Sequence, residues 1–150
     1  MEFPMTGNAA MSTRASQPAS AQIRVSDAMH HGVLTCTKDA SLAQVAELMA
    51  SHQVHCVVVE EDELADSDSP WGLVSDLDLV AAASVRDLDA QTAGPTAATA
   101  ALTISPRETL QCAAQLMTEH ETAHLVVVDS EGRPVGVLST LDIAAALSDR

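Results

Sequence analysis

The sequence predicts a mixed α/β (α+β) fold, in which two copies of a β-α-β-β-α unit pack with pseudo-two-fold symmetry into one module. The main observation is an internal repeat, because residues 33–83 and 101–146 carry the same pattern of apolar, histidine, glycine and aspartate positions. Within each copy, short β-type runs alternate with segments whose apolar residues recur at helical spacing. A unit of this size is too small to be stable alone, so we expect two copies that share one core and leave a cleft between them.

Composition divides the chain into four segments. Residues 1–22 are rich in Ser, Ala, Thr and Pro and have no apolar period, which predicts a disordered tail. Residues 23–85 form the first repeat, residues 86–100 a linker, and residues 101–150 the second repeat. Near the start of the first repeat, Ser26 is the expected cap of a short helical turn.

The first repeat is predicted to fold as strand, helix, strand, strand, helix. Its strands are expected at residues 33–37, 55–59 and 71–75, its second helix at residues 76–85, and an acidic loop at residues 60–70. The first helix is marked by apolar residues at spacing i, i+3, i+4 and i+7, which are Leu42, Val45, Ala46 and Met49. The strand at 55–59 is apolar on both faces, which indicates a sheet that is covered on both sides.

The second repeat follows the same order. Strands are expected at residues 102–104, 125–128 and 134–138, and a closing helix at residues 141–147. The helical stripe of this repeat consists of Leu110, Ala113, Ala114 and Met117. The preceding segment, residues 105–108, has the form of a capping box with Pro at the first helical position, so we expect the helix to begin there.

Charge and composition narrow the classes of partner. The net charge is −14 and the seven Lys and Arg residues are scattered, which argues against nucleic acid and against anionic membrane surfaces. No run approaches the ~20 apolar residues of a membrane span. Three cysteines without a C-x-x-C pair, and the lack of a basic N-terminal segment followed by an apolar stretch, favour the cytoplasm.

The sharpest local motif is G-x-x-S-x-x-D, which occurs once in each repeat where the third strand meets the second helix. Glycine allows close approach of a ligand to the backbone, and a serine at a helix start lies beside free N–H groups that favour anions. An aspartate one turn later can accept hydrogen bonds from both hydroxyls of a ribose. The same S-x-x-D spacing is a helix capping box, worth ~1 kcal/mol without any ligand, and periodicity does not separate the two roles. The six motif residues are Gly72, Ser75, Asp78, Gly136, Ser139 and Asp142.

The region from Ser26 to Leu147 resembles a tandem pair of CBS domains, the Bateman module. The element order, the Leu-Thr of each first strand, the His followed by valines in each second strand and the two G-x-x-S-x-x-D motifs all match. The resemblance implies that Asp78 and Asp142 hold adenosine ribose hydroxyls and that the two motif serines lie near phosphate. It also implies that the backbone of the first strands lines the base pocket, at Leu34, Thr35, Leu102 and Thr103.

His55 and His124 occupy the position at which nucleotide-binding gamma subunits of AMP-activated protein kinase have a histidine next to phosphate. In those subunits a basic residue follows, whereas Cys56 and Leu125 follow here. This departure removes the phosphate counter-charge and weakens the case for ADP or ATP. The candidate ligands implied by the resemblance are AMP, ADP, ATP and S-adenosylmethionine, and adenosine and a magnesium–nucleotide complex also stay open.

We therefore expect a regulatory module that binds an adenosine-type small molecule between the repeats and signals to an unknown effector protein. No catalytic constellation is visible, so we do not expect an enzyme. The resemblance further implies a homodimer formed by the Ala-rich helices at residues 81–83 and 144–146. Two alternatives stay open: a structural or protein-interaction dimer with empty clefts, and a metal- or redox-responsive protein built on His55, Cys56 and His124. No metal site is predicted, because the histidines lack convincing ligand spacing, and His52 and His120 fit helix ends.

Overall fold

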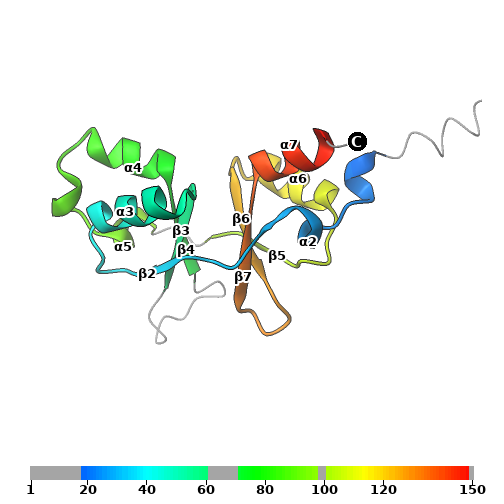
Figure 1. Ribbon diagram of the computed structural model, residues 1–150, viewed down its shortest axis with the longest axis horizontal. Coiled ribbons are helices and arrows are strands. Elements are labelled where there is room, and N and C mark those ends of the chain that lie inside the picture. Colours follow the sequence, from blue (N-terminus) through cyan, green and yellow to red (C-terminus); the bar gives the residue numbers. More distant parts are fainter. Residues whose placement is uncertain (1–17, 61–70, 98–100, 149–150) are drawn as a thin grey trace, which may run out of the picture.

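The structure is a computed structural model that describes residues 18–60, 71–97 and 101–148 (Figure 1). Most of the predicted N-terminal tail and the predicted acidic loop after Glu60 lie outside these residues. Within them, each repeat folds in the order β-α-β-β-α, so the predicted fold class is confirmed. The end of the predicted tail differs from expectation, because residues Ala19–Ala21 form a short 3-10 helix, η1, that contacts the second half of the molecule.

The first half contains a three-stranded sheet in the order β2-β3-β4, with β2 parallel to β3 and β4 antiparallel to it. Its elements are β2 (Thr35–Thr37), α3 (Leu42–His52), β3 (Cys56–Glu60), β4 (Trp71–Ser75) and α4 (Asp76–Ala83). The first four residues of β3 are all buried, so the sheet is covered on both faces, as its apolar run predicts.

The second half contains a four-stranded sheet in the order β1-β7-β6-β5. Its elements from the second repeat are β5 (Thr103–Ile104), α6 (Leu110–Glu119), β6 (His124–Val128), β7 (Pro134–Ser139) and α7 (Thr140–Ser148). The edge strand β1 (His30–His31) comes from the N-terminal region and pairs antiparallel with β7. The sequence pattern did not predict this strand.

Helix α6 begins later than predicted. Its N-cap is Thr109, whose hydroxyl accepts a hydrogen bond from a backbone N–H of the first turn, and its first residue is Leu110. The prediction of a start within residues 105–108 was wrong. The carbonyls of Pro106 and Glu108 accept hydrogen bonds from the N-terminal segment, which holds these residues in a turn.

The short helix α2 (Val25–Ala28) also has a different cap from the predicted one. Ser26 lies inside the helix, and the helix is preceded by Arg24. The backbone N–H of Arg24 donates a hydrogen bond to the Asp27 carboxylate, 3.2 Å from N to Oδ2. An acidic side chain in the first turn therefore satisfies a backbone donor at the helix start.

Two segments of the chain are exchanged between the halves. The segment before β2 packs on the second half, where the N–H of Leu110 donates to the carbonyl of Ile23. The linker between the repeats packs on the first half through η2 (Leu88–Ala90) and α5 (Ala93–Thr96), and the N–H of Ala93 donates to the carbonyl of Ala40. In Figure 1, α2 accordingly lies beside α6 and α7, away from the elements of the first half that follow it in sequence.

Each half has its own apolar core, in contrast to the single shared core that we expected, and the exchanged segment completes it. The first core consists of Leu42, Val45, Met49, Val57, Val59, Val74, Leu79, Ala93 and Ala97. The second consists of Ile23, Val25, Ile104, Leu110, Ala113, Met117, Leu125, Val127 and Leu138. Val58 and Val126 are fully buried but belong to neither core. Because alternate strand residues point to opposite faces, these two valines lie between the sheets, where the halves meet.

Among the described residues, no helix combines the length and the apolar character needed to cross a bilayer.

Candidate functional site

A cleft between the start of α4 and the second half is large enough for a small molecule, and we refer to it as the Asp78 cleft. Its volume is about 630 Å³. Small-molecule sites commonly measure ~300–1,000 Å³. Residues of both halves line it: Leu73, Ser75, Asp76, Leu77, Asp78, Ala101, Leu102, His120, Glu121, Thr122, Ala123 and His124.

A second cleft lies beside the start of α7, and we refer to it as the Asp142 cleft. Its volume is only about 70 Å³. This space is therefore small beside the ~300–1,000 Å³ of common small-molecule sites. Its lining residues are His30, Gly32, Val33, Leu34, Gln53, Val54, His55, Cys56, His124, Val137, Ser139 and Asp142. His124 lines both clefts.

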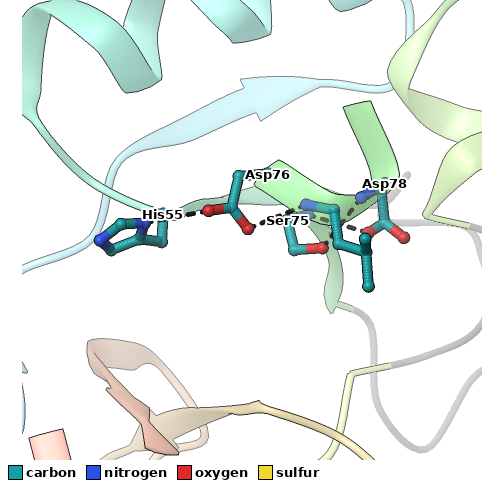
Figure 2. A network of polar contacts seen from close by, with 5 residues as sticks. His55, Ser75, Asp76 and Asp78 are labelled. Atoms are coloured by element: carbon teal, nitrogen blue, oxygen red, sulfur yellow. Dashed lines mark hydrogen bonds and ion pairs between the residues drawn. The ribbon is translucent and has the colours of Figure 1, made fainter. Parts of the chain in front are cut away.

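Both S-x-x-D motifs are helix capping boxes. The Ser75 hydroxyl accepts a hydrogen bond from the N–H of Asp78 at 3.2 Å, and the Asp78 carboxylate accepts one from the N–H of Ser75 at 2.9 Å (Figure 2). The same pair of bonds joins Ser139 and Asp142, at 3.1 and 2.9 Å. The capping role that the spacing predicts is therefore present twice. It uses only the Oδ2 atom of each carboxylate, so a cap and a ligand contact are compatible.

At the two motif glycines, the backbone of another segment of the chain packs where a side chain would otherwise lie. A Cβ at Gly72 would lie 2.6 Å from the carbonyl oxygen of Ala97, and a Cβ at Gly136 would lie 2.4 Å from the carbonyl oxygen of His30. Neither glycine lines the Asp78 cleft or the Asp142 cleft. The close approach that we expected of a ligand is thus made by the exchanged segments, through Ala97 at Gly72 and His30 at Gly136.

His55 and Asp76 form a hydrogen-bonded pair at the seam between the halves. The Nδ1 atom of His55 lies 3.0 Å from Oδ2 of Asp76 (Figure 2). The backbone is joined here as well, because the N–H of Asp76 donates to the carbonyl of His55 at 2.9 Å. The hydrogen bond from His55 holds the pKa of the Asp76 carboxyl below its ordinary value. Both side chains are more than half exposed, so the pair orients the groups more than it stabilises the fold.

His124 is the half-buried histidine of the seam. Burial lowers its pKa below the ordinary value, and the charge of nearby His55 acts in the same direction. The carboxylates of Asp76, Asp142 and Asp78 oppose this effect. The neutral imidazole is therefore favoured in the folded state.

Cys56 is chemically quiet. Its side chain is buried on β3, and burial, with a smaller effect of nearby carboxylates, raises the pKa of its thiol to about 12. A thiol reacts as the thiolate, so this cysteine is a poor nucleophile and a poor redox sensor at neutral pH. Cys56 instead contributes a small buried apolar side chain to the packing of β3.

The structure gathers most of the predicted site residues at the two clefts. Ser75, Asp78, Leu102 and His124 line the Asp78 cleft, while Leu34, His55, His124, Ser139 and Asp142 line the Asp142 cleft. Thr35 and Thr103 are exposed on β2 and β5 and line neither.

The sequence analysis did not assign six polar residues of the clefts to the site, which are His30, Gln53, Asp76, His120, Glu121 and Thr122. Asp76 follows the motif serine directly, and that position beside Asp78 was the available signal. His30 carried no signal, because it reaches the site on the exchanged strand β1.

Two β-α-β-β-α halves with exchanged segments, and with clefts at equivalent helix starts, define a tandem-repeat α/β module. Comparison with known families gives the particular class. The family model of the CBS domain matches residues 25–85 and 97–149. The chain belongs to the CBS domain family, and the resemblance inferred from the sequence is confirmed.

Three relatives illustrate the similarity. The chain is 27% identical over 121 residues to the CBS domain-containing protein YhcV of Bacillus subtilis, covering 80% of this chain and 82% of that protein. Its structure resembles the CBS domain protein PAE2072 from Pyrobaculum aerophilum complexed with AMP, with a TM-score of 0.68 and 29% identity over 85% of this chain and 100% of that chain. It also resembles Hypoxic Response Protein I with two coordinated zinc ions, with a TM-score of 0.63 and 25% identity over 81% of this chain and 97% of that chain.

Proposed function

We propose that this chain is a regulatory module that binds an adenosyl compound between its two repeats and transmits occupancy by a change in conformation or partner contact. The observation that carries the proposal is the Asp78 cleft, a space of about 630 Å³ in which a half-buried carboxylate faces residues of the other repeat. The similarity to PAE2072, which is complexed with AMP, supports this ligand class.

Asp78 is the residue that we propose to hold the ribose. Among the described residues, the N–H of Ser75 is the sole hydrogen-bond donor to its side chain, and this bond uses Oδ2. The Oδ1 atom can therefore accept a charge-assisted hydrogen bond from a ribose hydroxyl. Leu73, Ala101 and Leu102 supply apolar surface of the kind that packs against a purine.

The charges of the Asp78 cleft favour a ligand with little negative charge. Among the described residues, its lining includes the carboxylates of Asp76, Asp78 and Glu121 and no Lys or Arg. Each added phosphate therefore meets repulsion without a counter-charge. We propose the order adenosine, AMP and S-adenosylmethionine before ADP, and ADP before ATP.

The lining residues come from both repeats, and this supports a role in signalling. A ligand that contacts both halves favours the arrangement in which they are close, by the difference between its affinities for the two states. We propose that the chain acts without catalysis, as a homodimer that presents this change to an effector protein. Its free cysteines are compatible with the cytoplasm as the place of action.

A thermal-shift screen with AMP, S-adenosylmethionine, ADP, ATP and NAD tests the proposal. A ligand at one hundred times its dissociation constant adds ~2.7 kcal/mol, which corresponds to an increase in Tm of about 5–10 °C for a chain of this size. We expect AMP or S-adenosylmethionine to give this shift, and Asp78→Asn to abolish it. Asp89→Asn is the matched control, because it removes the same charge at an exposed position outside the cleft.

A flat response to every compound would favour the alternative of an interaction dimer with empty clefts. A response to zinc alone would favour the metal alternative, for which the similarity to zinc-containing Hypoxic Response Protein I is the specific observation. Among the described residues, no three His, Cys, Asp or Glu side chains are arranged to hold a metal ion. The redox form of that alternative is opposed by the raised pKa of Cys56.

A further inference from the structure

The two clefts are equivalent by sequence but differ in size by a factor of about nine, with volumes of about 630 and 70 Å³. Their motifs are the same, since each has a Ser and an Asp in a capping box at a helix start. The difference must therefore arise outside the motif. Among the described residues, the side chain of His30 both lines the smaller cleft and contacts its motif aspartate.

His30 engages the aspartate that a ligand would need. Its Nδ1 atom lies 3.1 Å from Oδ1 of Asp142, while Oδ2 accepts the N–H of Ser139 at 2.9 Å. Both carboxylate oxygens of Asp142 are thus engaged, and its side chain is only 11% exposed. The equivalent Asp78 has a partner on Oδ2 alone among the residues that the structure describes.

The backbone holds His30 in this place. Strand β1 pairs with β7 so that His30 lies opposite Val137 and His31 opposite Gly136, and the N–H of Gly32 donates to the carbonyl of Val135. The lack of a side chain at Gly136 lets the His30 carbonyl come close, since a Cβ there would lie 2.4 Å from that oxygen. The imidazole is therefore carried by a fixed strand and not by a free loop.

The other repeat has no histidine at the position equivalent to His30. Matching Leu34-Thr35 to Leu102-Thr103 in the sequence places Ala98 at the position of His30. Ala98 lies outside the described residues, but its methyl side chain has no polar atom with which to engage Asp78. The two repeats therefore differ in sequence at this pair of positions.

We propose that His30 closes the Asp142 cleft, so that each chain binds one adenosyl ligand, in the Asp78 cleft, and that removal of the imidazole opens a second site. The inference rests on the proposed function for the identity of the ligand. It assigns a regulatory task to β1, because any change that lifts this strand from β7 also frees Asp142.

Isothermal titration calorimetry with AMP tests the assignment. We expect one AMP per chain for the wild type, two for His30→Ala, and one again for His30→Ala combined with Asp142→Asn. His30→Asn retains an N–H donor near the position of Nδ1 and should keep the value at one. His31→Ala is the control, because His31 is on the same strand and its ring contacts the carbonyl of Ser26 instead.

The gain of a site between the wild type and His30→Ala is the deciding result. Equal stoichiometry in the two proteins, or two AMP per wild-type chain, would overturn the closure by His30. A wild type that binds no AMP contradicts the proposed use of the Asp78 cleft for AMP but leaves this comparison intact. In that case, an AMP site that appears in His30→Ala and is lost with Asp142→Asn still supports the closure, and its absence overturns it. The His30 side chain is 73% exposed, so its removal does not endanger folding.

Discussion

His124, which lines both clefts, couples the stability of the molecule to pH. Its pKa in the folded state is lowered by burial, so the unfolded chain binds a proton more readily than the folded one. The stabilising effect of the neutral ring is fully present above about pH 6.5, the ordinary histidine value. It is lost as the pH falls below that value towards the folded-state pKa.

We therefore predict that His124→Gln reduces the loss of Tm between pH 7.5 and pH 5. The glutamine keeps a polar side chain at the seam but does not titrate. Differential scanning calorimetry of both proteins across this range gives the measurement, and His52→Gln, at an exposed helix end, is the control. Parallel pH profiles of wild type and His124→Gln would show that burial of His124 has no such effect.

At the scale of single residues, the site was partly readable from the sequence. Ser75, Asp78, Ser139 and Asp142 could be found because a capping box has a fixed spacing, which the chain repeats. The contact between His55 and Asp76 could not be predicted, because the two residues lie 21 positions apart and only the pairing of β3 with β4 brings them together. The contact between His30 and Asp142 could not be predicted either, because these residues are still further apart in the sequence and the pairing of β1 with β7 brings them together.

At the scale of elements, the two motif glycines are the positions at which the exchanged segments closely approach the sheets. A methyl group at Gly72 would collide with Ala97 at 2.6 Å, and that neighbour is backbone. We predict that Gly72→Ala costs about 1–3 kcal/mol in the free energy of unfolding, in the range of overpacked sites. Urea denaturation provides the measurement.

Gly132→Ala separates this steric cost from the cost of backbone conformation. Gly132 has a φ of 81° and nothing within 4 Å of an added Cβ, so its substitution costs about 1 kcal/mol from conformation alone. Gly72 has no positive φ. A Gly72→Ala protein as stable as the wild type would mean that α5 is not held against β4.

The helices and strands themselves followed from hydrophobic period, with errors at their ends. The stripes at residues 42–49 and 110–117 form α3 and α6, and the apolar runs form β3, β4, β6 and β7. The start of α6 was misplaced, because a capping motif at residues 105–108 competes with hydrogen bonds from the N-terminal segment. The residues around the helix start do not reveal where the N-terminal segment packs, so the local sequence was insufficient to place the first residue of α6.

At the scale of the whole molecule, the outer faces of α4 and α7 are apolar and exposed. Leu77, Val80 and Leu141 are 73%, 67% and 64% exposed. Large exposed apolar residues grouped in this way commonly mark a contact surface. A second copy of the chain is the occupant that we propose, because both helices derive from the same element of the repeat and so present equivalent faces.

We predict that the wild type has twice its chain mass of 15.6 kDa in solution, and that Val80→Glu combined with Leu141→Glu gives the monomer. Burial of an unpaired carboxylate is strongly unfavourable, whereas at a solvated face it is harmless. Size-exclusion chromatography with light scattering measures the mass, and Gln115→Glu on the exposed side of α6 is the control. A wild-type monomer, or a dimer that survives the double substitution, would contradict this arrangement.

The duplication, the β-α-β-β-α order and the two capped aspartates are local properties, set by side-chain period and by spacing over a few residues, and they could be read directly from the chain. The exchange of segments is not local. It brings His30 to Asp142 and Ala97 to Gly72 across tens of residues, and it divides the interior into two cores. The two repeats therefore carry equivalent motifs beside clefts of unequal size. Hydrogen bonds between distant segments determine that both carboxylate oxygens of Asp142 are engaged, whereas among the described residues Asp78 has a partner on one oxygen only.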